Sequence, residues 1–140
     1  MSVEVLNVSL REWGGAEATG SLFFDLIGLQ PGTDYTSYPS DSPHKAARIV
    51  LASVSLAECA PGPERHQEFA SKIGAGLKRA ADWLASLVPA GFDEWRARGM
   101  VADIFIGGWM NSDQFDLKLP PDFLFACGRL GLPIEICTND

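Results

Sequence analysis

Residues 3–10 have the sequence VEVLNVSL, in which apolar and polar side chains alternate. Leu6, Val8 and Leu10 fall on one side of an extended strand, and the polar side chains between them fall on the other. This alternation is typical of a strand that buries one face and leaves the other in water. It predicts a sheet with one covered face.

Further segments have strand character. Residues 47–56 and 101–109 are rich in β-branched and apolar side chains, and residues 115–119 and 134–138 alternate over shorter lengths. The side chains expected to face the core from these strands are Val50, Ala52, Val54, Leu56, Ala102, Ile104, Ile106, Ile134 and Ile136. A doubly wound parallel sheet would show continuous apolar strands instead, so the pattern favours an α+β fold.

Four helices are expected between the strands, at residues 16–29, 64–88, 92–98 and 121–130. The longest has an apolar stripe that includes Leu77 and Leu84, and both are expected to be buried. Gly74 and Gly76 weaken this helix and indicate either close packing against a neighbour or a bend. Pro31 with Gly32 is expected to stop the first helix.

The predicted fold is therefore α+β, with a four- to five-stranded, mainly antiparallel sheet and helices packed on one face. Residues 1–140 are expected to form a single domain, since this length suits one domain. Pro89 and Gly91 are expected to end the long helix, and residues 30–46 to form a long surface loop.

The charge balance excludes some classes of partner. Lys and Arg total 11 against 18 Asp and Glu, a net charge of -7. Proteins that bind nucleic acids or anionic membranes present basic surfaces, so neither partner is expected. No apolar run is long enough to span a bilayer, and residues 1–13 lack the features of a secretory signal. A cytoplasmic location is expected.

No residue pattern identifies a catalytic, cofactor-binding or metal site. His44 and His66 belong to no metal-binding motif, and the three cysteines lack a CxxC spacing. Ser40, Asp41 and His44 crowd into one loop, whereas a hydrolase triad needs its members fixed by the scaffold. We therefore expect no catalytic residue, metal ligand or cofactor, and we expect the cysteines to be buried free thiols.

Side chains on the polar side of the last strands form a candidate binding surface. Phe105 stands among carboxylates there, and Trp109 lies at a strand end, where an exposed aromatic side chain can anchor an interface or pack at the rim of the core. The carboxylates are either solvated surface or a patch that steers a basic partner. Docking of a foreign protein, self-association as a homodimer, and covering of Phe105 by the C-terminal residues or the 31–46 loop all fit the pattern. The candidate residues are Asp103, Phe105, Trp109, Asp113 and Glu135.

A pattern of packing and turn positions runs through nearly the whole chain. It consists of the strand LNVSL at 6–10, the helix end IGLQP at 27–31, Leu84 and Leu87 in the long helix, and a tail with LPP at 119–121, Leu124 and LGL at 130–132. In these positions the chain resembles a small bacterial domain-of-unknown-function family, number four-two-seven-nine. The loop after the first helix lacks the Lys-Gly pair that members of this family commonly carry. The resemblance implies a fold and no established activity.

Two classes of function are compatible with the sequence. The first is a non-catalytic protein-binding module such as a toxin-immunity protein, because such inhibitors are small and often acidic. The alternative is a small enzyme or ligand-binding domain that uses the 31–46 loop as a lid. That alternative requires a deep pocket lined by His44, Cys59 or the acidic turn at residues 111–114.

Overall fold

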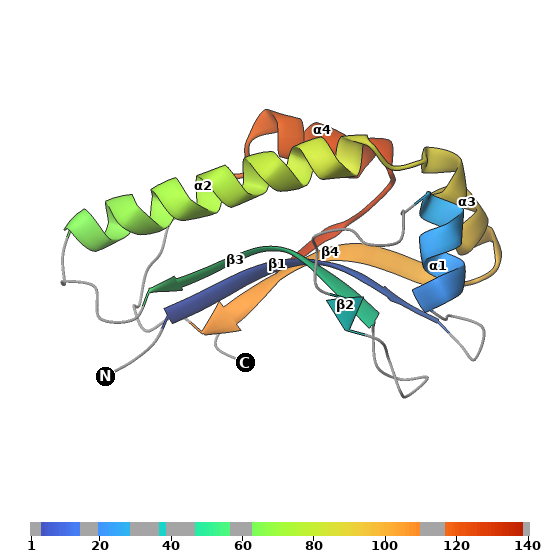
Figure 1. Cartoon of the computed structure of the whole chain (residues 1–140), viewed down its shortest axis with the longest axis horizontal. Helices are drawn as coiled ribbons and strands as arrows, with labels where there is room; N and C mark the ends of the chain where they lie inside the picture. The colour runs from blue at the N-terminus through green and yellow to red at the C-terminus, as the bar shows by residue number, and fades with distance from the viewer. Residues whose placement is uncertain are drawn as a thin grey trace.

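A five-stranded sheet forms the base of the fold in the computed structural model, which describes residues 4–14, 20–28, 37–38, 47–56, 63–109 and 117–138. Its strands are β1 (Glu4–Trp13), β2 (Ser37–Tyr38), β3 (Ala47–Leu56), β4 (Val101–Trp109) and β5 (Ile134–Thr138). They lie in the order β2-β3-β1-β4-β5, with β1 in the centre (Figure 1). Only the β4–β5 pair is parallel, so the sheet is mixed and mainly antiparallel, as predicted.

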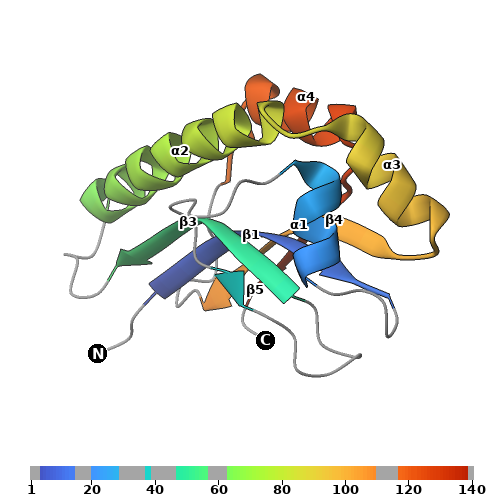
Figure 2. The same ribbon diagram turned by 45° about the vertical axis from the view of Figure 1, so that its right-hand side comes forward.

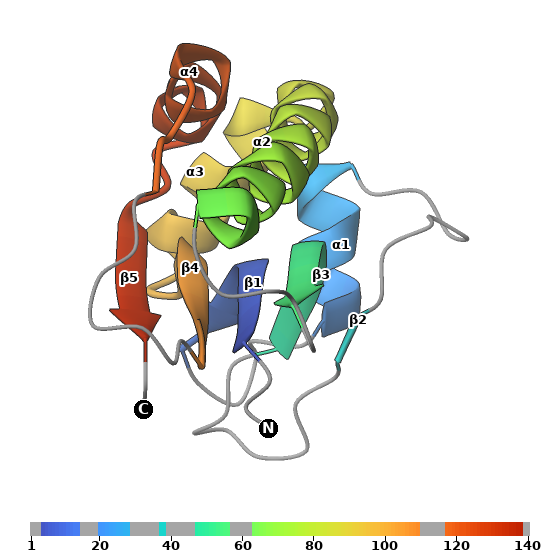
Figure 3. The same ribbon diagram turned by 90° about the vertical axis from the view of Figure 1, so that its left-hand side faces the viewer.

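All four described helices lie on the same side of the sheet (Figures 1 and 2). They are α1 (Gly20–Ile27), α2 (Pro63–Ala85), α3 (Pro89–Ala97) and α4 (Pro121–Arg129). In Figure 3, α2 and α4 lie above the strands, while α1 runs down beside β3. The predicted α+β architecture with helices on one face is confirmed.

The core lies between β1 and the helices. Leu6, Val8 and Leu10 are buried on the side of β1 that faces the helices, as their alternation predicted. Leu77 and Leu84 of α2 are completely buried above the sheet, which confirms the predicted stripe. Burial of each such side chain contributes about 1.5–3 kcal/mol.

An aromatic cluster joins α1 to α3 at one end of the core. The ring of Phe23 lies 4.9 Å from that of Trp95 and 5.7 Å from that of Phe92, centroid to centroid. The indole N–H of Trp95 donates a hydrogen bond to the carbonyl oxygen of Val101, so the buried ring keeps its polar atom satisfied. An added Cβ on Gly91 would collide with the carbonyl oxygen of Leu26, which shows how closely the two helices approach.

The predicted phase of β3 is wrong in its first half. Val8 pairs with Ala52 but Ser9 pairs with Val50, so Leu51 is an extra residue and the register shifts. A one-residue shift exchanges the two faces of a strand. Val50 therefore lies opposite Ser9 on the side away from the helices, and Ile49 faces the core in its place.

Helix boundaries differ from the prediction wherever Gly or Pro was given the wrong role. The described α1 ends at Ile27, where Gly28 adopts a φ of 82°, so Gly28 and not Pro31 terminates it. Likewise, Pro89 begins α3 rather than only ending α2, because the first helical position needs no N–H partner. Consequently α3 begins before the predicted residue 92 and Gly91 lies inside it.

Arg129 closes the C-terminal end of α2 from another helix. Its Nη2 donates to the carbonyl oxygens of Leu84, Ala85 and Leu87 at 3.3, 2.8 and 2.9 Å. These carbonyls lie at or just beyond the C-terminal end of α2, where carbonyl groups run out of partners in the helix and a cation is favoured by the helix dipole. The carbonyl oxygen of Leu84 also accepts a hydrogen bond from the backbone N–H of Leu87. Arg129 therefore caps α2, which ends at Ala85 although the apolar stripe continues to Leu87.

Two short segments also differ from the prediction. Ser37–Tyr38 forms β2 inside the stretch that was expected to be only loop, while most of residues 30–46 lies outside the described residues. Residues 117–119 of the expected strand at 115–119 are not in a strand, and residues 115–116 are not described. Leu117 and Leu119 instead pack partly buried against the core.

The two glycines of α2 should respond oppositely to alanine. An added Cβ on Gly74 would meet nothing within 4 Å, whereas one on Gly76 would lie 2.8 Å from the Cβ of Ala52. Gly74→Ala should therefore raise the free energy of unfolding by about 0.5–1 kcal/mol, since alanine favours the helix. Gly76→Ala should give no gain and a net loss of up to about 2 kcal/mol, because β3 must move. Urea denaturation of both variants checks the pair, and a gain at Gly76 would contradict the packing.

Candidate functional site

The side of the sheet away from the helices, here called the open face, is the candidate site. Strand pairing aligns Ser9 with Phe105 and Phe105 with Glu135, and Arg11 with Asp103. None of the described helices packs on this side (Figures 1 and 2). The predicted shared face of the candidate residues of β4 and β5 is therefore confirmed. The described residues of the open face on β1, β4 and β5 are Val5, Asn7, Ser9, Arg11, Trp13, Val101, Asp103, Phe105, Gly107, Trp109, Glu135 and Cys137.

Arg11 is the centre of the charged part of the open face. Its Nε and Nη2 donate to the two carboxylate oxygens of Asp103 at 2.9 and 2.6 Å, and Nη2 also donates to Glu135 at 3.1 Å. Such a bidentate pair fixes the guanidinium in one plane. The hydrogen bond that Arg11 donates to Asp103 raises the pKa of Arg11 further above its ordinary value, against the opposing effect of burial.

Aromatic rings hold the same guanidinium from two sides. The Arg11 Cζ atom lies 4.0 Å from the ring centroid of Phe105 and 5.1 Å from that of Trp13. Both distances lie within the range of cation–π attraction. Arg11 therefore ties β1 to β4 and β5 and cannot turn toward a ligand without losing these contacts.

Phe105 is half-buried. Its position on the polar side of β4 would leave it in water only if that face were bare. An added Cβ on Gly107 would collide with the Phe105 ring, so the ring lies over that glycine. Ser9 pairs with Phe105 on the neighbouring strand β1 and is buried. Its hydroxyl has no hydrogen-bond partner among the described residues. Residues 31–46 and the C-terminal end, which were expected to cover Phe105 if no partner does, lie mostly outside the described residues. Gly107 and the sheet around it cover one side of the Phe105 ring.

The acidic cluster predicted on the last strands is only partly a surface patch. Asp103 is 4% exposed and is neutralised by Arg11, so it is not a solvated carboxylate. The side chain of Glu135 is 61% exposed and shares the same arginine. Asp113 lies outside the described residues.

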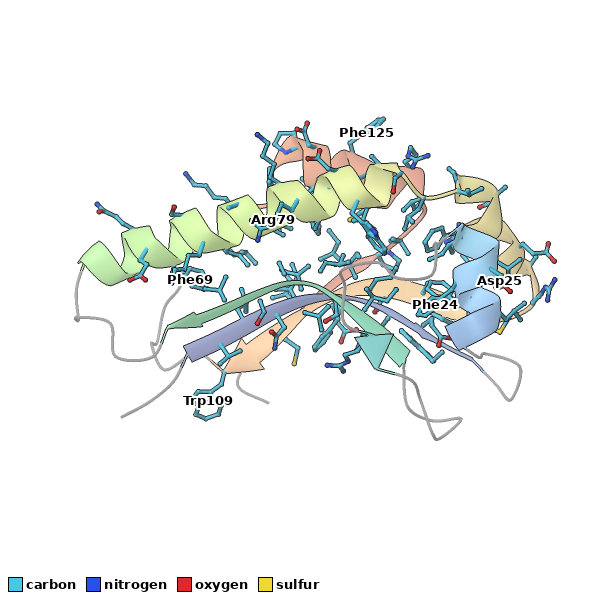
Figure 4. All side chains as sticks on the ribbon, viewed as in Figure 1. Phe24, Asp25, Phe69, Arg79, Trp109 and Phe125 are labelled. Carbon is cyan, nitrogen blue, oxygen red and sulfur yellow. The ribbon has the colours of Figure 1, made fainter. Side chains whose placement is uncertain are left out.

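Trp109 is the most exposed aromatic side chain of the open face among the described residues. It is 53% exposed and projects below the sheet, away from the helices (Figure 4). Of the two alternatives that the sequence left open for this tryptophan, an exposed anchor or packing at the rim of the core, the structure shows the exposed side chain. By contrast, Trp95 is fully buried and Trp83 is partly buried against the core.

Glu12 is a buried acid that the sequence analysis missed. Glu12 continues the every-second-residue pattern of Leu6, Val8 and Leu10, so its side chain points toward the helices. It is 2% exposed there. Its Oε2 has no hydrogen-bond partner among the described residues. Burial raises the pKa of Glu12 from 4.5 to about 7. The alternation that continues past Leu10 was the available signal, since it puts residue 12 on the apolar side.

Replacing Glu12 with glutamine should stabilise the protein above pH 7. Between pH 4.5 and about 7 the folded chain holds a proton that the unfolded chain releases, so stability is greatest below pH 4.5 and falls as the pH rises through this window. Glu12→Gln removes this loss and should raise the free energy of unfolding above pH 7 by about 1–3 kcal/mol. Urea denaturation across the window should show the gain shrinking as the pH falls; an equal gain at every pH would contradict the protonation argument.

The described residues contain no cluster suited to a metal ion. No three His, Cys, Asp or Glu side chains of this part of the chain lie together in a way that could hold one. His44 and Cys59, which the alternative enzyme hypothesis placed in a pocket, lie outside the described residues.

Of the other two cysteines, only Cys127 is a buried free thiol as predicted. Burial raises its pKa to about 11, so the reactive thiolate is scarce near neutral pH. Cys137 is half-buried, contrary to the expectation that all the cysteines are buried.

None of the described helices is both long and apolar enough to cross a membrane. Comparison of the chain with family models, with curated proteins and with solved structures finds no match in any of the three. The resemblance to family four-two-seven-nine therefore stays a prediction.

Proposed function

We propose that this chain is a non-catalytic protein-binding module that docks a basic protein against the open face. The observation that carries the proposal is an exposed Trp109 on the same sheet face as a charged cluster held rigidly by Arg11, six residues away along β4. None of the described helices packs on this face. Tryptophan and arginine are enriched among the residues that contribute most to protein interfaces.

The arrangement suits an interface because its anchors are already ordered. Arg11 is held by Asp103, Glu135 and two rings, so little side-chain entropy is lost on docking. A sheet face that carries an aromatic anchor and, farther along, a charged cluster resembles the core and rim of a protein interface.

Charge favours a basic partner. The chain has a net charge of -7, which attracts a positively charged surface over a distance of about one Debye length. The most specific form of the proposal is a toxin-immunity protein, whose small acidic fold neutralises a basic toxin. In this form the chain acts by covering the toxin's surface and needs no chemistry of its own.

Protection of cells from a neighbouring toxin tests this form. The product of the gene directly upstream is expressed with and without this chain, and growth is measured. We expect the wild-type chain to restore growth and Trp109→Ala to fail, with binding of the purified partner weakened about 30-fold.

Phe125→Ala is the matched control. Phe125 is also an exposed aromatic side chain, but it projects from α4 on the opposite side of the molecule (Figure 4), so its truncation should leave protection intact. A harmless upstream product, or full protection by Trp109→Ala, would contradict the proposal. Binding that does not weaken as salt is raised would contradict the role of charge.

A further inference from the structure

The outer edge of β5 offers a second surface, distinct from the open face. β5 is the last strand in the sheet order, so within the described part of the chain no strand pairs with its outer edge. The backbone N–H of Ile104 donates to the carbonyl oxygen of Pro133, which fixes the direction of the groups that follow. Because backbone groups alternate sides along a strand, Ile134, Ile136 and Thr138 direct their N–H and C=O groups away from β4.

Natural sheets protect such edges with lysine, proline, bulges or very short strands. The other end of the described sheet, β2, is two residues long. β5 spans five residues, IEICT, and contains neither lysine nor proline. Ile136 is also 50% exposed, although it was predicted to point into the core.

We propose that two copies of this chain pair antiparallel through β5, with Ile136 opposite its own counterpart. In this register Ile134 lies opposite Thr138 of the second copy. In each of these pairs the backbone groups point toward the other copy, so the two residues exchange both N–H···O hydrogen bonds. A two-fold axis perpendicular to the sheet produces this pairing and leaves the helices of both copies on one side. The two sheets then form one continuous sheet.

Side-chain chemistry selects this register. The contact of Ile136 with its counterpart removes an exposed apolar side chain from water. Glu135 falls opposite Cys137 of the second copy. A pairing centred on Glu135 would place two carboxylates opposite each other, which is unfavourable. A pairing centred on Cys137 would move Ile134 beyond the end of the opposing strand.

The β5 pairing and the docking of a basic protein respond oppositely to salt. Each copy carries a net charge of -7, so like-charge repulsion opposes the pairing and salt should strengthen it. Docking of a basic partner should weaken as salt rises. The pairing uses the strand edge and not Trp109, so either idea can fail while the other holds.

Sedimentation equilibrium of the purified full chain tests the pairing. With rising concentration the mass should move from 15.1 kDa toward twice that value, and more readily in high salt. Ile136→Lys should weaken association at least about tenfold, because two ammonium groups then meet at the axis. Val101→Lys is the matched control, since Val101 is another exposed aliphatic side chain on a strand but precedes the residues of β4 that pair with β5, and it should associate like the wild type. A wild-type mass of 15.1 kDa at every concentration, or a dimer that persists in Ile136→Lys, would overturn the proposal.

Disulfide formation at single positions tests the register without relying on a charged variant. In a chain with Cys59 and Cys137 replaced by serine, Ile136→Cys is oxidised with glutathione disulfide. Cα atoms of directly opposite, hydrogen-bonded residues lie about 5.5 Å apart, within the reach of a disulfide. Ile136→Cys should therefore form covalent dimers, whereas Ile134→Cys should form few. Faster cross-linking at position 134 than at 136 would overturn this register.

Discussion

Truncation of Leu84 to alanine should lower the free energy of unfolding by about 2–5 kcal/mol. Leu84 lies in α2 above the sheet and is 0% exposed, as is Leu77 two turns earlier in the same helix. Removal of the buried side chain loses its transfer free energy and leaves a cavity that rigid neighbours fill only in part. Leu77→Ala should have an effect of the same size. Urea denaturation followed by far-ultraviolet circular dichroism measures both.

Leu124→Ala is the matched control for these truncations. Leu124 is exposed on α4, so the same chemical change there creates no cavity and should cost less than about 1 kcal/mol. Unchanged urea midpoints for Leu77→Ala and Leu84→Ala would show that the long helix does not depend on this stripe.

Replacement of Arg11 with alanine should lower the free energy of unfolding nearly as much as Leu84→Ala does. Arg11→Ala leaves the Asp103 carboxylate, whose side chain is 6% exposed, without its bidentate partner. An uncompensated buried charge is strongly destabilising, and we expect a loss of about 2–4 kcal/mol because the pair keeps some contact with water. Glu135→Gln should cost less than about 1 kcal/mol, since that side chain is largely exposed.

A double variant separates two contributions to stability: the destabilisation by an unpaired, buried Asp103 carboxylate and the stabilisation by the Arg11–Asp103 ion pair. Replacement of both Arg11 and Asp103 with leucine removes the two charges together, and apolar replacements of buried pairs are often neutral. The double variant should therefore be more stable than Arg11→Ala. A double variant that is less stable would show that the ion pair itself, and not the desolvated Asp103, carries the stability.

The covered and open faces of the sheet could be predicted because alternation is a local signal. Leu6, Val8 and Leu10 repeat at the period of a strand, and that period alone states which side is buried. The same argument placed Phe105 and Glu135 on one side of the sheet, and the strand register confirms it. The exposure of Trp109 could not be decided in this way, because a strand end is compatible both with an exposed side chain and with packing at the rim of the core.

The missed features depend on contacts between residues far apart in sequence. Arg11 and Asp103 are 92 positions apart, so no local pattern couples them, and Asp103 was expected in water. The register shift at Leu51 depends on how β1 and β3 pair, which the local pattern of β3 does not contain. Because of this shift, Val50 faces away from the helices instead of toward the core. Arg129 likewise caps the end of α2 from a different helix. Each of these is a tertiary effect that overrides a correct local pattern.

The central position of β1 has a consequence for synthesis of the chain. β1 leaves the ribosome before both of its sheet neighbours, and one of them, β4, begins only at Val101. At the usual rate of about 5–20 residues per second, β1 waits roughly 4–18 s before β4 can pair with it. During that time one edge of an apolar strand stays unpaired in the nascent protein. Conditions that slow translation after Trp13 should therefore increase aggregation of the newly made chain.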